Sequence, residues 1–142
     1  MKQKPGYYYR QSAVIPYYKE NGRLSVVLIT TKKKKKWTLP KGIVEPHLSS
    51  SESAREEAFE EAGIEGYIDD RLFDRFEYEK WGGTCTVQVF LMRVTRVHPT
   101  WPESEDRVRE FFYPCRAREL IGRKEIEPVL AKFCNHQDEL PL

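Results

Sequence analysis

Residues 42–64 read GIVEPHLSSSESAREEAFEEAGI, and this stretch decides the fold. It contains three glutamates, Glu57, Glu60 and Glu61, at the spacing i, i+3 and i+4. In a helix this spacing places all three carboxylates on one face. Carboxylates this close repel one another, so such a face is either screened by water or neutralised by a divalent cation. The stretch therefore predicts an acidic helix that is either a solvated surface or a metal site.

The boundaries of that helix can be read from its end signals. Ser49 and Glu52 have the spacing of a capping box, which marks a helix N-terminus. Gly63 is suited to the left-handed conformation that ends a helix. We expect a helix from about Ser50 to Ala62. Its apolar stripe consists of Ala54, Ala58, Phe59 and Ala62.

The stretch resembles the Nudix box, a 23-residue pattern with fixed positions for glycine, glutamate, arginine and apolar residues. The match holds at Gly42, Glu57, Ala58, Glu60, Glu61, Gly63 and Ile64, and the preceding Leu39-Pro40-Lys41 is also usual for the family. The sequence departs from the pattern at Leu48, where a glutamate is expected, and at Glu56, where an arginine is expected. Arg55 stands one residue early.

The resemblance implies an α/β fold, specifically an α/β/α sandwich with a mixed β-sheet. It also implies hydrolysis of a diphosphate linked to another group, with Mg²⁺ or Mn²⁺ as the cofactor. Glu57, Glu60 and Glu61 would be the catalytic metal ligands, with Glu61 the first choice for a direct ligand. One of the three would take a proton from water, and the sequence does not say which. The glycine at 42 would bring a backbone carbonyl near the metal.

The two departures bear on the metal site. In the family pattern the arginine orients the helix carboxylates, and Arg55 lies about 100° round the helix from position 56, so it cannot simply replace that arginine. Leu48 cannot ligate a metal ion, so the site holds fewer ions than usual or takes a carboxylate from outside the box. The candidates by position are Glu103, Glu105 and Glu110. Glu45 either serves the metal through water or is a solvated loop residue.

Five consecutive lysines, residues 32–36, stand before the box. Such a run is usually a solvated loop. The resemblance places it near the substrate mouth, where ammonium groups would favour a phosphate-rich ligand. Lys32, Lys34 and Lys36 are therefore candidate substrate-binding residues. Lys41 is a fourth candidate, with an ordinary surface residue as the equal alternative.

The rest of the chain predicts strands and two further helical segments within one domain, residues 1–142. Strands are expected at residues 12–19, 24–31, 37–39, 67–80 (one strand or two), 84–95 and 108–113, and helical segments at 115–121 and 126–133. Pro16 suggests that the first strand lies at an edge or contains a bulge. Asn21-Gly22 predicts a hairpin, and residues 84–95 predict a central strand.

Composition narrows the class of partner. The 24 basic and 22 acidic residues give a net charge of +2, too even to imply binding to nucleic acid or membranes through bulk charge. No apolar run reaches membrane-spanning length. Cys85, Cys115 and Cys134 lack metal-binding spacing, which predicts reduced, buried thiols in a cytoplasmic protein. We therefore expect a small phosphorylated substrate, with a homodimer left open.

Three functions fit the sequence. The first is a metal-dependent hydrolase of diphosphate linkages in nucleoside diphosphate derivatives or related polyphosphates, of the dinucleoside polyphosphate or diphosphoinositol polyphosphate type. The second is a non-catalytic nucleotide- or polyphosphate-binding module on the same fold, which Leu48 and Glu56 would explain. The third is a pyrophosphohydrolase acting on the 5′ end of RNA, where the lysine run would hold a short nucleic-acid segment.

Overall fold

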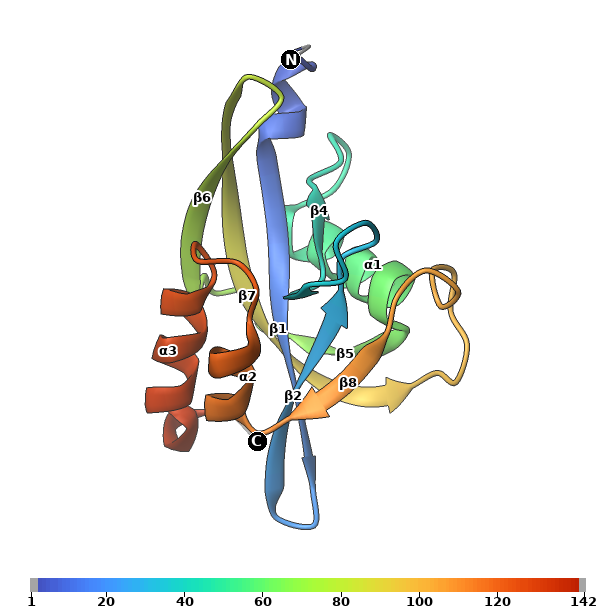
Figure 1. Cartoon of the computed structure of the whole chain (residues 1–142), viewed down its shortest axis with the longest axis vertical. Helices are drawn as coiled ribbons and strands as arrows, with labels where there is room; N and C mark the ends of the chain where they lie inside the picture. Colours follow the sequence, from blue (N-terminus) through green and yellow to red (C-terminus); the bar gives the residue numbers. More distant parts are fainter. Residues whose placement is uncertain (1–2, 141–142) are drawn as a thin grey trace.

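Two long strands, β1 (Arg10–Glu20) and β7 (Gly83–Val97), lie parallel and side by side at the centre of the sheet (Figure 1). The computed structural model describes residues 3–140. All other strand pairs are antiparallel, so the sheet is mixed. The remaining strands are β2 (Arg23–Thr30), β3 (Trp37–Thr38), β4 (Lys41–Ile43), β5 (Ile64–Ile68), β6 (Asp74–Lys80) and β8 (Arg109–Phe112).

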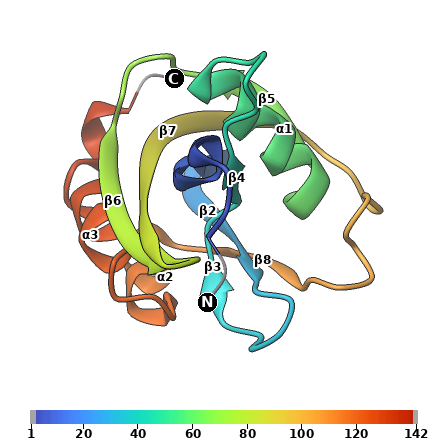
Figure 2. The same ribbon diagram turned by 90° about the horizontal axis from the view of Figure 1, so that it is seen from above.

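Helices cover both faces of this sheet. They are α1 (Ser50–Ala62), α2 (Pro114–Leu120) and α3 (Glu127–Asn135), with short 3-10 turns at Gly6–Tyr9 and Gln137–Glu139. Seen from above, α1 lies on one side of the curved sheet, and α2 and α3 lie on the other (Figure 2). The expected α/β/α sandwich with a mixed β-sheet is therefore confirmed.

The alternation of side chains along β1 supplies both hydrophobic cores. Val14 belongs to the core under α1, where it is buried with the three alanines of that helix. Ala13, Ile15 and Tyr17 belong to the core on the opposite face, under α2 and α3. This period of two is what a strand buried on both faces requires. The small alanine side chains of α1 let the helix lie close to the sheet.

Pro16 lies neither at an edge nor at a bulge, because β1 pairs with β7 in continuous register across it, so the expectation of an edge or a bulge was wrong. β1 is central: β7 lies on one side of it, and β4 and β2 share the other side. β4 pairs with residues 11–13 of β1, whereas β2 pairs with residues 17–20. Pro16 falls between these two segments, so its missing N–H interrupts neither antiparallel ladder.

Helix α1 has the predicted bounds because both of its end signals form. The backbone N–H of Glu52 donates to Ser49 Oγ (3.2 Å), and the backbone N–H of Ser49 donates to Glu52 Oε1 (2.8 Å). Gly63 ends the helix with φ of 64°. None of the helices within residues 3–140 is both long and apolar enough to cross a membrane.

Two of the three cysteines contradict the expectation of reduced thiols. Cys115 of α2 and Cys134 of α3 form a disulfide, and Cys85 is the buried free thiol. Their separation of 19 residues has no recognisable motif, and only the packing of α2 against α3 brings them together.

Removing this disulfide should destabilise the protein. A bridge that closes a loop of this length restricts the unfolded chain and contributes about 3 kcal/mol. Cys134→Ser should therefore lower the free energy of unfolding by about 2–3 kcal/mol in urea titrations without reductant. Dithiothreitol should lower the stability of the wild type to that of the variant, and a wild type insensitive to reductant would contradict this prediction.

Candidate active site

The acidic face of α1 borders a cavity of about 970 Å³ that also contacts β4, β6 and the loop after β2. Its acidic lining residues are Glu45, Glu57, Glu61 and Glu125. Its basic lining residues are Lys32, Lys33, Lys34, Lys36, Lys41, Lys80, Arg107, Arg123 and Lys124. The cavity therefore has carboxylates at one end and a wall of cations around them.

Glu57 lies against Gly42 of β4. A Cβ atom built at Gly42 would overlap the carboxyl group of Glu57, so glycine at this position leaves room for the side chain where it lies. Burial raises the pKa of Glu57 to about 8, and the neighbouring carboxylates of Glu61 and Glu60 add to the shift. The surroundings of the half-buried Glu57 carboxyl therefore disfavour its charged form.

Glu61 is fixed through both of its carboxylate oxygens. The backbone N–H of Lys41 donates to Oε1 (3.1 Å), and Nη2 of Arg107 donates to Oε2 (3.2 Å). Burial raises the pKa of Glu61 to about 7, although the charge of Arg107 and the hydrogen bond from Lys41 act in the opposite direction. These contacts hold the Glu61 carboxylate at the edge of the cavity.

Glu60 is placed differently from the other two. Its side chain is exposed and does not line the cavity, although burial and the charges of Glu103 and Glu56 raise its pKa. Within residues 3–140, no three His, Cys, Asp or Glu side chains gather closely enough to hold a metal ion. Helix spacing brings the three to one region, and their side-chain torsions would have to converge on an ion.

The groups that are present nevertheless fit Mg²⁺ or Mn²⁺. These cations prefer oxygen ligands, and the carboxylates of Glu57 and Glu61 face one cavity with Glu45. Burial raises the pKa values of both Glu57 and Glu61, and a cation in the cavity would offset the cost of charging these carboxylates. The space beside Gly42, which a Cβ would fill, lets the Glu57 carboxyl reach the backbone of β4.

The structure also places the two residues that depart from the box pattern and the carboxylates considered outside the box. Leu48 is half-buried in the loop before α1, and Glu56 is exposed on the helix and does not line the cavity. Of the three carboxylates considered outside the box, Glu103 lies near the site, because it pairs with Lys32 (3.5 Å) and Arg107 (2.7 Å). Glu105 and Glu110 are exposed and do not line the cavity.

The four candidate substrate-binding lysines, Lys32, Lys34, Lys36 and Lys41, all line the cavity. Lys41 is the most buried of them, and its Nζ donates to the hydroxyl of Tyr78 (2.9 Å) while lying 4.5 Å from the centre of that ring. Burial lowers the pKa of Lys41 to about 8, and the charges of Arg123 and Lys80 lower it further. Arg123 also lies against Tyr78, at 4.7 Å from the ring centre.

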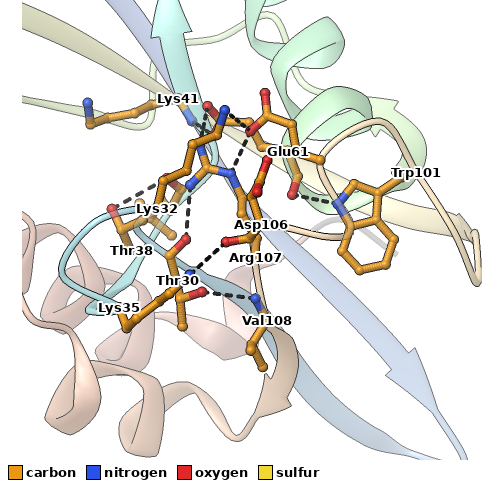
Figure 3. A network of polar contacts seen from close by, with 12 residues as sticks. Thr30, Lys32, Lys35, Thr38, Lys41, Glu61, Trp101, Asp106, Arg107 and Val108 are labelled. Atoms are coloured by element: carbon orange, nitrogen blue, oxygen red, sulfur yellow. Dashed lines mark hydrogen bonds and ion pairs between the residues drawn. The ribbon is translucent and has the colours of Figure 1, made fainter.

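Sequence reasoning missed Arg107, Tyr78 and Arg123, because none of them belongs to a motif. The segment between β7 and β8 contacts the C-terminal end of α1, and Figure 3 shows Trp101 and Arg107 of this segment beside Glu61. Trp101 Nε1 donates to the carbonyl of Glu61 (2.8 Å), and Arg109 Nη1 donates to the carbonyl of Ala62 (2.8 Å). The one available signal was the missing arginine at position 56, which required a substitute elsewhere.

Stability in the absence of metal should fall as pH rises. The pKa of Glu57 is raised from 4.5 to about 8 in the folded protein, so the folded state is favoured while this carboxyl is protonated. The contribution of the protonated Glu57 carboxyl to the free energy of unfolding is complete below about pH 4.5 and is lost as pH rises through 8. With allowance for its partial exposure, we expect a loss of about 2 kcal/mol.

The measurement is thermal unfolding in EDTA between pH 5 and 9, with Glu57→Gln as the matched variant. The variant has no carboxyl to ionise, so it should gain stability relative to the wild type as pH rises. Parallel curves for the two proteins would contradict this prediction.

Comparison with known proteins agrees with this geometry. A model of the NUDIX domain matches residues 8–134. "Nudix hydrolase 21, chloroplastic" of Arabidopsis thaliana is 34% identical over 136 residues, which cover 91% of this chain and 68% of that protein. "Nudix hydrolase 13, mitochondrial" of the same plant is 27% identical over 121 residues, covering 78% of this chain and 60% of that protein.

Solved structures agree as well. The binary complex of C. elegans Ap4A hydrolase superposes with a TM-score of 0.76 at 22% identity, covering 92% of this chain and 98% of that one. At this identity the likeness establishes the fold alone. The family match, by contrast, covers most of the chain and includes the carboxylates of α1 and the turn at Gly42. The chain therefore belongs to the NUDIX family of pyrophosphohydrolases, as the resemblance of residues 42–64 implied.

Proposed function

We propose that this protein hydrolyses diphosphate linkages in nucleoside diphosphate derivatives or related polyphosphates, with Mg²⁺ or Mn²⁺ as cofactor. The observation that carries the proposal is the composition of one cavity. The carboxylates of Glu57 and Glu61 lie at one end of it, and nine basic side chains line the same space. A ligand that suits both must bring metal ions and several phosphate groups together.

The protein's own groups divide the work. Glu57 and Glu61 would hold the ion, with Glu60 turning inward from the helix surface and the Gly42 carbonyl as a further oxygen ligand. When bound, such a cation lowers the pKa of a water ligand and offsets negative charge on phosphoryl oxygens. A glutamate of α1 that is not engaged by the ion is the natural acceptor for the proton of the attacking water. The lysines of the wall bind the phosphates that are not transferred.

Lys41 has a particular place in this wall. Its ammonium is buried between the carboxylate end and the cations of Lys80 and Arg123, which is why its pKa is lowered. Arg123 already pairs with Glu125 (2.7 Å), so a phosphate group in the cavity would chiefly supply counter-charge to the buried ammonium of Lys41. This arrangement favours substrates with three or more phosphates, such as dinucleoside polyphosphates and diphosphoinositol polyphosphates, over substrates with a lone diphosphate.

The test is phosphate release from a panel of nucleotide sugars, dinucleoside polyphosphates, nucleoside triphosphates and inositol pyrophosphates, with Mg²⁺ and then with Mn²⁺. Turnover that EDTA abolishes would support the proposal and identify the substrate class. Absence of turnover on every member, in a folded protein that binds one of them, would favour the second function. That function is a nucleotide- or polyphosphate-binding module, and Leu48 and Glu56 are the observations that favour it.

Action on the 5′ end of RNA is a narrower alternative, because Lys32, Lys33, Lys34 and Lys36 line the cavity mouth. Affinity for a triphosphorylated RNA oligonucleotide would then fall steeply between low and moderate salt. A flat response to salt would exclude this alternative.

The lysines of the loop should determine KM rather than kcat. For the best substrate of the panel, Lys34→Gln/Lys36→Gln should raise KM about tenfold and leave kcat within about threefold, because these residues face the cavity but not the carboxylates. The control is Lys19→Gln/Lys35→Gln, which removes the same charge from positions outside the cavity lining. Equal effects of the two pairs would mean that bulk charge, not contact, guides the substrate.

Three further points stay proposals. We propose one domain over residues 1–142, with a homodimer as the alternative to a monomer. We also propose a cytoplasmic location, although the disulfide removes the argument from reduced cysteines, and the two relatives above are named chloroplastic and mitochondrial.

A further inference from the structure

Arg107 makes the contact with a helix carboxylate for which the box of this chain has no arginine. The sequence has a glutamate at position 56, and Glu56 is exposed on α1 and adds negative charge next to Glu60. No basic side chain of α1 makes a hydrogen bond or ion pair with Glu61 in the described part of the chain. The guanidinium that contacts Glu61 instead comes from the segment before β8.

Three acceptors from different parts of the chain hold the guanidinium of Arg107. Nη2 donates to Glu61 Oε2 on α1 (3.2 Å), Nε donates to Glu103 Oε1 (2.7 Å), and Nη1 donates to the carbonyl of Thr30 at the end of β2 (2.9 Å). The side chain is only 10% exposed, and that of Glu61 is 13% exposed. Figure 3 shows Arg107 lying between Glu61 and Thr30. A buried guanidinium that makes three directed hydrogen bonds is held in one orientation, whereas the side chains of a surface ion pair are free to move.

The segment that holds Arg107 is itself tied to α1. Trp101 Nε1, the backbone N–H of Glu103 and Arg109 Nη1 donate to the carbonyls of Glu61, Glu60 and Ala62. These carbonyls are the ones that a helix C-terminus leaves without partners. Because the segment satisfies them, its position relative to α1 is set to within hydrogen-bond tolerance. The distance from Arg107 to Glu61 is therefore constrained by these three hydrogen bonds and not only by the contact of two long side chains.

We propose that Arg107 is the positioning residue of Glu61 and supplies from outside the box the guanidinium that position 56 lacks. Arg107 takes one oxygen of the carboxylate and the N–H of Lys41 takes the other. The remaining lone pairs of Glu61 are then directed at the cavity, where the cation would lie. Arg107 also lines the cavity, but three of its N–H groups are engaged by Glu61, Glu103 and Thr30, so we infer that it acts on the reaction through Glu61.

The inference rests on the proposed function for its kinetic test but not for its binding test. Mn²⁺ binding is measured without substrate by the loss of the EPR signal of free Mn²⁺. Arg107→Gln should weaken Mn²⁺ binding at least threefold, because the Glu61 carboxylate is no longer held. In turnover of the best substrate of the panel it should lower kcat at least tenfold at saturating Mg²⁺, with KM changed less than threefold.

The discriminating step is a double-mutant cycle with Glu61→Gln. If Arg107 acts through Glu61, Arg107→Gln should change Mn²⁺ affinity and kcat less than twofold in the Glu61→Gln background. Arg107→Lys keeps the charge but cannot reach three acceptors at once, so it should recover only part of kcat. Arg116→Gln removes one charge from an exposed ion pair within α2 and is the control for net charge.

Arg109→Gln controls for docking of the segment, because Arg109 donates only to carbonyls. Its effects on Mn²⁺ affinity should be smaller than those of Arg107→Gln at equal loss of thermal stability. The proposal is overturned if the effects of Arg107→Gln persist undiminished in the Glu61→Gln background, if they fall on KM alone, or if Mn²⁺ affinity does not fall. If the panel gives no turnover, the Mn²⁺ cycle still decides the role of Arg107, and only the proposed function fails.

Discussion

Glu61→Gln is expected to lower kcat by about three orders of magnitude while the protein stays folded. The amide keeps the shape of the side chain and can still accept the N–H of Lys41 (3.1 Å in the wild type). It carries no charge, however, so it binds a divalent cation poorly and gives less stabilisation to the phosphoryl group in the transition state. The measurement is phosphate release at saturating Mg²⁺, with circular dichroism to confirm folding.

Glu56→Gln is the matched control for this variant. It makes the same change on the same helix, at an exposed position that does not line the cavity. Its kcat should stay within about twofold of the wild type. Full activity of Glu61→Gln, or equal losses in the two variants, would mean that the catalytic carboxylates lie elsewhere.

Gly42→Ala should lower kcat by about two orders of magnitude. The added Cβ would overlap the Glu57 carboxyl, so either that side chain leaves its position or β4 moves away from α1. A displacement of about 1 Å in a catalytic group can cost a hundredfold in rate. Gly6→Ala is the control, because a Cβ at Gly6 meets nothing within 4 Å.

Two measurements separate the cause of that loss from general unfolding. The thermal midpoint of Gly42→Ala should stay within a few degrees of the wild type, while Mn²⁺ binding weakens. Unchanged kcat and unchanged Mn²⁺ binding in a folded Gly42→Ala variant would show that the contact between Gly42 and Glu57 does not control the site.

Local signals in the sequence predicted the helix and its neighbourhood well. The capping box at Ser49 and Glu52 and the glycine at 63 gave the bounds of α1, because these interactions are made within a few residues. The hairpin at Asn21-Gly22 formed for the same reason, with both residues at positive φ. Glu57 and Glu61 were predicted as site residues from their helix spacing together with the Nudix box, and both line the cavity.

Features that depend on distant contacts could not be predicted in this way. Pro16 suggested an edge strand, but its effect depends on which strands lie beside β1, and local sequence does not contain that information. The disulfide between Cys115 and Cys134 depends on how α2 packs on α3. Arg107 reaches Glu61 across 46 residues of sequence, and only the sheet determines that the two meet.

The contacts that close the C-terminal end of α1 also constrain the order of folding. Its last carbonyls receive donors from Trp101 and Arg109, which lie 40 and 47 residues further along the chain. Closing loops of this length costs chain entropy, and these contacts stabilise the C-terminal end of α1 only after the loops have closed. A nascent chain that ends before residue 98 therefore carries the complete box and can form the helix, but it lacks the donors that fix the carboxylates. We therefore expect catalytic competence to be acquired late in folding, after β7 has formed and the segment that follows it has packed on α1.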